Sequence, residues 1–488
     1  LADMPSETLA AALALIGIVI LVSSLLSGVI ERTALPQVAI FLLLGAVLGP
    51  AGLRLIELTL ESPTLQWIAT LGLVLVLFTD AIVMDFGEIR RPRRLLFMIL
   101  GPATLIPAVI IALAAWLLLD LAPLSSFIVG AALASTDPVM LRGVIRRPSL
   151  PAPVREALRL EGGINDVVLL PIIVLSILAL RPTENLASEL GRHTVGLFLL
   201  GPGLGALVGY IAITLLEQVR KRVGVRRDYE SLYALGVAFT AFATAESVGG
   251  SGFLAAFAAG VVIALLDVEL CDCFLDYGQA TAEMFLLLTF VAFGAGLIWT
   301  GVSVADGPTL LFAAVALLAR TAVLLPALRW IGIEPRNRRI IAWSGPRGLS
   351  SLLLVLLPVF SGVPEGERLF AITSLVVLLS VALHGTGLAI FIRRTEGPAP
   401  KPAEITSAPV TTKPDPDRGV PERITLDELR HLRAAGLPVI VADVRTDRSY
   451  RADKLKAAGA VRLPPDDAVR QAREMGLDHH ATVVLYCA

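Results

Sequence analysis

Charged residues are scarce in this chain, because Asp, Glu, Lys and Arg together make up only 17% of its 488 residues. A soluble globular domain carries about 25% charged residues. The scarcity therefore excludes a chain that is soluble along most of its length. Hydrophobic residues make up 55% of the sequence, and the mean hydropathy is +0.77. These values indicate a polytopic membrane protein.

Cysteine is also scarce, with three residues in the whole chain. So few cysteines exclude a disulfide scaffold. Cys271 and Cys273 are too close in sequence to form a comfortable bridge, and the further ligands that a metal site would need are missing around them. We therefore expect this pair to have no role in redox chemistry or metal binding.

Two further absences concern positive charge. The net charge of −1 provides no general positive field, so nothing in the composition indicates a nucleic-acid partner. In addition, no cluster of Lys or Arg precedes the first apolar run, which is long. We therefore expect this run to be a retained helix and not a cleaved signal peptide.

Long apolar segments recur along the chain as far as Arg394. Each is 17–25 residues long, which is the length that a helix needs to cross a hydrocarbon core about 30 Å thick. We predict an all-α membrane domain over residues 1–394 with thirteen transmembrane helices. The predicted helices are 8–30, 34–53, 64–84, 95–119, 124–141, 157–180, 194–217, 230–248, 251–267, 281–300, 308–328, 339–360 and 368–392.

The arginine and lysine residues of the loops favour one orientation of this domain. If the N-terminus lies outside, the inward loops contain the basic clusters at 90–94, 142–155, 220–227 and 329–339. The outward loops then contain few basic residues. By the positive-inside rule, we expect a multi-pass protein of the cell (inner) membrane, with its N-terminus outside and its C-terminal part in the cytoplasm.

The composition changes after Arg394. Residues 395–421 are rich in Pro, Thr and Lys, which predicts an extended linker. Residues 422–488 have a soluble α/β pattern: a capping box (Thr425 with Glu428) opens a short helix, and buried strands are predicted at 437–443 and 482–487. Because the last strand ends one residue before the end of the sequence, we interpret this domain as incomplete.

Two of the predicted helices are interrupted. Residues 135–138 (Ser-Thr-Asp-Pro) break the fifth helix, and residues 343–348 (Trp-Ser-Gly-Pro-Arg-Gly) break the twelfth. If the seventh helix is a connector, the breaks take equivalent positions in two inverted six-helix repeats, which is where transporters bind their substrates. The alternative is that Pro and Gly only kink these helices, as they often do in membranes.

Charged residues stand in or near the two breaks. An acid at bilayer depth costs about 2.5–3.5 kcal/mol on insertion scales, so it usually serves an ion or a proton. Asp137 and Asp166 are such acids, and Asp80 is a third, near the inner end of its helix. If the breaks cross, Asp137 can offset the positive helix ends and Arg347 the negative ones.

Glu161, Asn165 and Asp166 lie within six residues of one another on the sixth helix. Glu161 lies one turn before Asn165, and we expect it to pair with Arg320 as a scaffold bond and not as a transport group. Arg320 and Arg347 then face three acids, which are Glu161, Asp137 and Asp166. Two arginines can pair with two of them, so one acid is left to titrate. The alternative for Asp166 is that it too is simply paired.

These motifs together resemble the NhaP branch of monovalent cation:proton antiporters over residues 8–393. They are the Ser-Thr-Asp-Pro break, the Glu-x-x-x-Asn-Asp motif that ends at Asp166, the segment 251–255 with Ala259-Gly260 after it, and the two arginines. The resemblance implies that Asp166 is the principal ion and proton carrier. It also implies that Asp137 and Thr136 coordinate the cation, Thr136 partly through its backbone carbonyl, and that the protein is a homodimer.

One position departs from this family pattern. Many relatives have a serine after the glutamate, where it adds a ligand, and here that residue is Gly162. Water or another group must replace the missing oxygen, so the resemblance leaves the choice of cation open among Na⁺, Li⁺ and K⁺.

A transport mechanism follows from the buried acid itself. Burial disfavours the charged form of a carboxylate, so Asp166 binds either a proton or a small cation, but not both. If the site opens to one side of the membrane and then the other, and can do so only when a proton or a cation neutralises Asp166, each proton that crosses is exchanged for a cation. This is antiport. Because Asn165 stands beside Asp166 in place of a second acid, we predict electroneutral exchange of one Na⁺ (or Li⁺ or K⁺) for one H⁺, without a cofactor.

The tail resembles a rhodanese domain. The resemblance rests on Asp443-Val444-Arg445, the segment 458–464 and the strand that ends at Cys487. In that family the cysteine holds a persulfide, cradled by loop amides that this sequence does not reach. A regulatory or silent domain and an active sulfurtransferase are both compatible with the sequence.

Two functions of other classes are alternatives. The first is a passive cation channel, but one long chain with paired broken helices argues against it, because channels show pore loops or charged rings around a symmetry axis. The second is a membrane-anchored sulfurtransferase or a redox-regulated transporter. Thirteen spans with buried acids are far more than an anchor needs.

Overall fold

The chain forms two compact units, residues 1–399 and 400–488. The structure is a computed structural model. It describes residues 17–22, 25, 37–55, 58–84, 97–99, 101–137, 140–141, 145, 150–180, 186–222, 227–266, 272–396, 429–430, 432–433, 438–445, 450, 456–464, 468–477 and 481–486.

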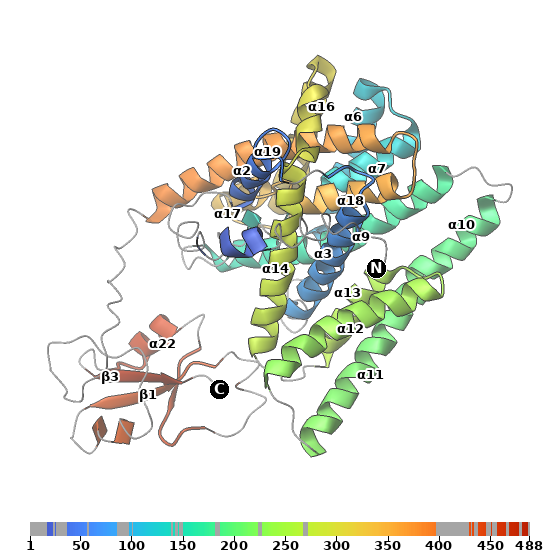
Figure 1. The fold of residues 1–488 in the computed structure, drawn as a ribbon. Coiled ribbons are helices and arrows are strands. Elements are labelled where there is room, and N and C mark those ends of the chain that lie inside the picture. Colours follow the sequence, from blue (N-terminus) through green and yellow to red (C-terminus); the bar gives the residue numbers. More distant parts are fainter. Residues whose placement is uncertain are drawn as a thin grey trace. The chain divides into compact units, whose positions relative to one another are not determined.

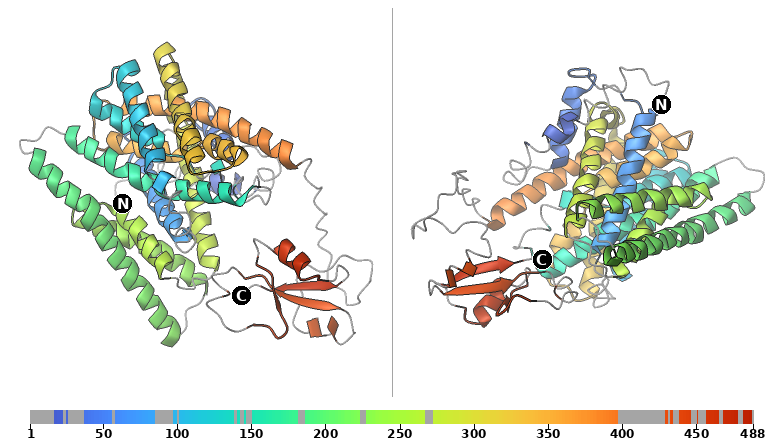
Figure 2. Two further views of the ribbon diagram at one scale, coloured as in Figure 1. Left: turned by 180° about the vertical axis from the view of Figure 1, so that it is seen from behind. Right: turned by 60° about the horizontal axis from the view of Figure 1, so that its bottom comes forward.

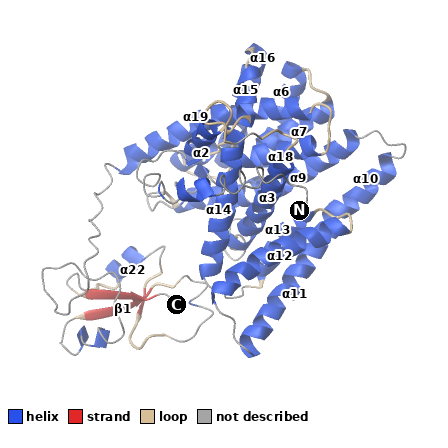
Figure 3. Cartoon of the chain, viewed as in Figure 1, coloured by secondary structure: helices blue, strands red, loops and turns tan. Residues whose placement is uncertain are grey.

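Every secondary-structure element among the described residues of the first unit is a helix (Figures 1 and 3). Their bounds are α2 (Gln37–Leu48), α3 (Pro63–Val83), α6 (Pro102–Leu119), α7 (Pro123–Ala134), α9 (Ala152–Leu180), α10 (Leu186–Val195), α11 (Gly201–Arg222), α12 (Arg227–Ser247), α13 (Gly252–Leu265), α14 (Asp272–Gly294), α15 (Thr300–Ser303), α16 (Gly307–Trp330), α17 (Pro335–Trp343), α18 (Leu349–Phe360) and α19 (Gly366–Glu396).

Six described helices are long and apolar enough to cross a membrane, or seven if the bent pair Thr281–Gly294 and Leu297–Ser303 is one span. Four shorter apolar helices accompany them: α2, α7, α13 and α18. Each predicted segment from 34–53 onward contains a described helix. The first segment, 8–30, lies mostly outside the described residues, so the total of thirteen stays a prediction.

Helix α13 is clamped between α11 and α3 by small residues, and α11 runs beside α12 and α13 in both views of Figure 2. A Cβ added to Gly205 of α11 would lie 2.0 Å from the carbonyl oxygen of Ala255 on α13. A Cβ added to Gly260 on α13 would lie 2.6 Å from the carbonyl oxygen of Phe78 on α3. Small residues thus allow these helix backbones to approach closely, and the segment 251–260 is a packing contact.

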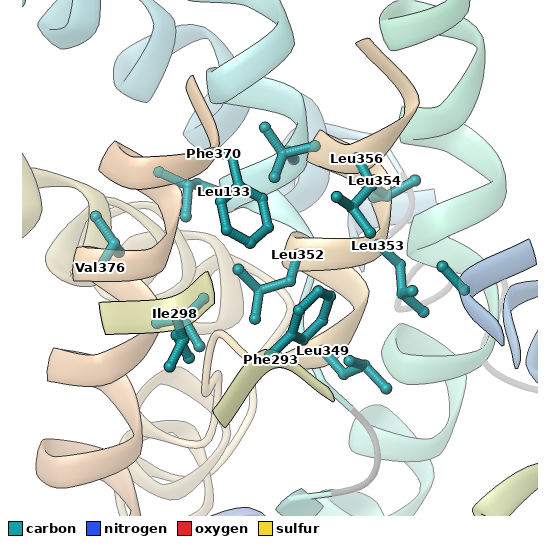
Figure 4. Packing of buried hydrophobic residues seen from close by; sticks show 14 of the residues in the cluster. Leu133, Phe293, Ile298, Leu349, Leu352, Leu353, Leu354, Leu356, Phe370 and Val376 are labelled. Carbon is teal, nitrogen blue, oxygen red and sulfur yellow. The ribbon is translucent and has the colours of Figure 1, made fainter. Parts of the chain in front are cut away.

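Helix α18 lies in the centre of the unit. All eight residues from Leu349 to Leu356 are buried, as is typical of a helix enclosed on every side. Figure 4 shows its leucines packed with Leu133 of α7, Phe293 of α14 and Phe370 of α19. This packing holds the N-terminal end of α18 in place, and that end forms part of the site described below.

The second unit contains a parallel three-stranded sheet in the order β2-β1-β3. Its elements are β1 (Val439–Asp443), β2 (Val461–Arg462), α22 (Ala468–Glu474) and β3 (Thr482–Tyr486). Both predicted strands are present, but only β1 has buried residues, because Val483 and Leu485 of β3 are exposed. β2 was not predicted as a strand. The capping residues Thr425 and Glu428, together with Cys487, lie outside the described residues.

A buried ion pair closes the end of β1. Arg445 donates to both carboxylate oxygens of Asp443, with Nη2 at 2.7 Å from Oδ2, and the Tyr486 hydroxyl donates to Oδ2 at 2.9 Å. The hydrogen bond from Arg445 is the main cause that lowers the pKa of Asp443 to about 2. The Asp-Val-Arg motif therefore ties the end of β1 to the end of β3.

Candidate functional site

Both predicted helix interruptions are present in the structure. α17 ends at Trp343, residues 344–348 are not helical, and α18 begins at Leu349. α7 ends at Ala134, and residues 135–137 continue without helical structure. Pro138 lies outside the described residues. Non-helical backbone at this depth needs partners from the protein itself, and each break supplies them to the other.

Asp137 connects the first break to the start of α18. Its backbone N–H donates to the Pro346 carbonyl at 2.9 Å, and its Oδ2 accepts the Leu349 N–H at 2.9 Å. The first N–H groups of a helix have no partner within the helix and carry partial positive charge. A carboxylate that is 1% exposed thus caps a buried helix end. Gly348 makes room for it, because a Cβ there would lie 1.9 Å from Oδ2.

Arg347 makes the opposite connection, from the second break to the end of α7. Its side chain is fully buried, and Nη1 donates to the carbonyls of Ala134 at 2.6 Å and Ser135 at 3.0 Å. These carbonyls belong to the negative end of α7. The two charges therefore compensate the helix ends as expected from the sequence. Within the described part of the chain, Arg347 Nε and Nη2 have no hydrogen-bond partner.

Helix α19 holds the second break from another side. The Arg347 backbone N–H donates to Ser380 Oγ at 2.7 Å, and Ser380 Oγ lies 3.1 Å from His384 Nδ1. The His384 ring packs against Trp343, with ring centroids 5.3 Å apart. The polar residues of α19 thus fix the unwound backbone at Arg347.

The Glu161–Arg320 pair expected from the sequence is present between α9 and α16. Arg320 Nε donates to Glu161 Oε1 at 2.5 Å, and a second contact joins Nη2 to Oε2. The other bonds of this arginine could not be foreseen from the sequence. Its Nη1 donates to the carbonyls of Ile341 at 2.9 Å and Ala342 at 2.8 Å, so Arg320 also caps the C-terminal end of α17.

Asp166 lies on α9 beside the first break and is 4% exposed. Ser135 Oγ donates to its Oδ1 at 2.5 Å, and the Ser350 side chain also interacts with the carboxylate. Asn165 Nδ2 donates to Thr136 Oγ1 at 2.7 Å. Among the described residues, Asn165 Oδ1 is a buried acceptor without a partner. Oxygen atoms from α9, the α7 break and α18 thus gather around one buried acid.

Asp80, the further candidate acid, comes from a different helix. It lies on α3 next to Gly163 of α9, and a Cβ added to Gly163 would be 3.9 Å from the Asp80 carbonyl oxygen. Its role as an ion ligand stays a prediction. No group of three or more His, Cys, Asp and Glu suited to a metal occurs among the described residues.

Ser135 and Ser350 were not predicted as site residues. A weak signal was available, because each serine stands close to the charged residue of a break. Ser135 stands two residues before Asp137, and Ser350 stands three residues after Arg347. The neighbouring Ser351 also donates to the Ser135 carbonyl, at 3.5 Å. Polar side chains directly beside a break in an apolar helix therefore belong on the list of candidates.

Comparison with known proteins finds similar chains that are named as antiporters. The K(+)/H(+) antiporter NhaP2 of Shewanella oneidensis is 29% identical over 423 residues, which cover 80% of this chain and 68% of the relative. The Na(+)/H(+) antiporter NhaG of Bacillus atrophaeus is 23% identical over 405 residues, covering 77% of this chain and 74% of the relative.

A solved structure has a similar fold. The sodium proton antiporter MjNhaP1 from Methanocaldococcus jannaschii superposes with a TM-score of 0.63 at 21% identity, covering 79% of this chain and 99% of that one. The family described as the sodium/hydrogen exchanger, transmembrane, matches residues 17–394. Because this match spans most of the sequence, the chain belongs to the sodium/hydrogen exchanger family.

Proposed function

We propose that this protein is a secondary active antiporter that exchanges a monovalent cation for a proton across the cell membrane. The observation that carries the proposal is the position of Asp166. Its buried carboxylate accepts a hydrogen bond from the Ser135 hydroxyl beside a helix break. Family membership supports it, as do relatives named for Na⁺/H⁺ and K⁺/H⁺ antiport.

The chemistry is competition for one carboxylate. Asp166 is neutralised by a proton or by a cation, and the site changes its access only when neutral, because moving a bare anion through the hydrocarbon is costly. Asp137 and Thr136 add oxygens to the cation site. Asp137 already accepts the Leu349 N–H, which holds its carboxylate in place while Asp166 exchanges a proton for a cation.

The neighbours of Asp166 favour electroneutral exchange. The position before it is Asn165, which is neutral, and Glu161 is paired with Arg320. One acid is then left to exchange charge, so one cation moves for each proton. In this reading the Glu161–Arg320 pair is scaffold, since it holds α9 to α16 and to the end of α17.

Proton movement in reconstituted liposomes tests the proposal. A pH-sensitive dye is followed inside the vesicles after addition of NaCl, LiCl or KCl, and exchange with at least one of these salts is expected. Asp166→Asn should reduce the signal to that of empty liposomes. Asp120→Asn is the matched control, because Asp120 lies in a loop at φ 52°, a conformation that Asn tolerates.

The same liposomes test the stoichiometry. On a solid-supported membrane, an electroneutral exchanger gives no sustained current while the dye reports proton movement. A steady current would contradict one-for-one exchange, and cation flux that is independent of the proton gradient would favour a passive channel.

We also infer the arrangement of the chain in the membrane from the basic loops. The N-terminus lies outside, residues 395–421 link the membrane unit to a cytoplasmic tail, and the protein forms a homodimer. Single cysteines introduced at each end in a cysteine-free background, labelled from one side, test the orientation. Both ends reacting from the same side would refute it.

A further inference from the structure

The hydroxyl and the backbone carbonyl of Ser135 have different hydrogen-bond partners. The Ser135 carbonyl accepts bonds from Arg347 and Ser351, which fix the backbone of the break. The side chain is fully buried, and its Oγ donates to Asp166 Oδ1 at 2.5 Å. The one group at this residue that can still turn is therefore the O–H that faces the carboxylate.

We propose that Ser135 Oγ is a ligand of the transported cation and that its O–H turns away from Asp166 when the cation arrives. This inference rests on the proposed antiport function. A hydroxyl carries one proton and two acceptor lone pairs. Without a cation the proton satisfies Asp166, and with a cation the lone pair and the carboxylate face the same ion. The change needs only a rotation about the Cβ–Oγ bond.

A neutral ligand of this kind suits the charge balance of the site. Ser135 adds an oxygen without adding a charge, so a single positive ion still neutralises Asp166. Alkali cations are hard ions that bind oxygen atoms. Asn165 Oδ1 gives independent support, because it is buried and has no donor among the described residues, whereas its amide nitrogen is engaged by Thr136. A bare acceptor beside the break is expected where a cation is received.

The test compares Ser135→Ala, Ser135→Cys and Ser135→Thr in the liposome assay. Losing one oxygen ligand to a charged partner should raise the KM for the transported cation about tenfold, while kcat stays near that of the parent. Cysteine keeps the size of serine but supplies sulfur, which binds alkali cations poorly, so it should behave like alanine. Threonine keeps the hydroxyl and should restore the KM.

The pH dependence separates a ligand from a simple hydrogen-bond donor. If Ser135 only donated to Asp166, its removal would strengthen proton binding, and the rise in KM would vanish at alkaline pH, where protons no longer compete. A ligand role predicts a rise that persists there. Ser126→Ala is the control, because Ser126 is a buried serine of α7 whose hydroxyl donates to the Leu121 carbonyl.

The outcomes distinguish this inference from the proposed function. Exchange by the parent protein with an unchanged KM at alkaline pH in Ser135→Ala would overturn the inference and leave antiport standing. Absence of cation-dependent proton movement in the parent would overturn both. If the alanine variant is poorly folded, Ser135→Cys gives the same comparison with the side-chain volume kept.

Discussion

Replacing Gly348 by alanine should disable the crossing of the two broken helices. The added Cβ would lie 1.9 Å from Asp137 Oδ2, and ordinary contact begins at 3.4 Å. The carboxylate would therefore have to withdraw by about 1.5 Å, the difference of these distances. It cannot do so and keep its 2.9 Å bond to the Leu349 N–H.

The expected cost follows from what that bond does. A hydrogen bond to a charged group contributes about 1.5–3 kcal/mol, and here both partners are buried and would be left without each other. We expect Gly348→Ala to lower the free energy of unfolding by about 2–3 kcal/mol and to abolish exchange, because Asp137 loses its position beside Asp166.

Thermal unfolding of the detergent-purified protein measures the first effect, and the liposome assay measures the second. Gly203→Ala is the matched control, since nothing lies within 4 Å of a Cβ at Gly203 on α11. Wild-type melting temperature and wild-type exchange in Gly348→Ala would refute the contact between the two breaks. Loss of stability in both variants would point to a general sensitivity to glycine replacement.

Three further predictions concern other contacts. Glu161→Gln leaves the buried charge of Arg320 without its partner and should destabilise the protein by about 3–5 kcal/mol. Thermal unfolding measures this loss. A smaller loss in the double variant with Arg320→Gln would separate the loss of the ion pair from the cost of a lone buried charge. Gly205→Leu should separate α11 from α13 and lower the melting temperature more than Gly203→Leu. A Cβ at Gly205 would lie 2.0 Å from the Ala255 carbonyl oxygen, whereas nothing lies within 4 Å of a Cβ at Gly203. In the tail, the pKa of Asp443 is lowered to about 2, so its stabilising effect is complete above its unfolded pKa of about 4 and is lost as the pH falls toward 2. Limited proteolysis of the tail should show this acid sensitivity, and Asp443→Asn should remove its pH dependence in this range.

The breaks and their charges could be predicted because the relevant residues are conspicuous. Pro and Gly interrupt apolar runs, and a charged side chain inside such a run needs a partner. The roles of Asp137 and Arg347 at opposite helix ends followed from helix dipoles alone. Glu161 and Arg320 followed from the small number of intramembrane cations.

The serines could not be predicted in the same way. A serine in an apolar helix commonly bonds to a nearby backbone carbonyl, as Ser126 does to that of Leu121, so only their closeness to a break separates Ser135 and Ser350 from it. The second role of Arg320 depends on α17 ending beside α16, which is a matter of packing. β2 is only two residues long, too short to show an alternating pattern.

The mutual capping of the broken helices constrains how the protein can move. Asp137 satisfies the start of α18, and Arg347 satisfies the end of α7. Sliding one broken helix past the other would strand two buried charges and two helix ends at once. We therefore expect the two broken helices to move together as a rigid body during the exchange proposed above.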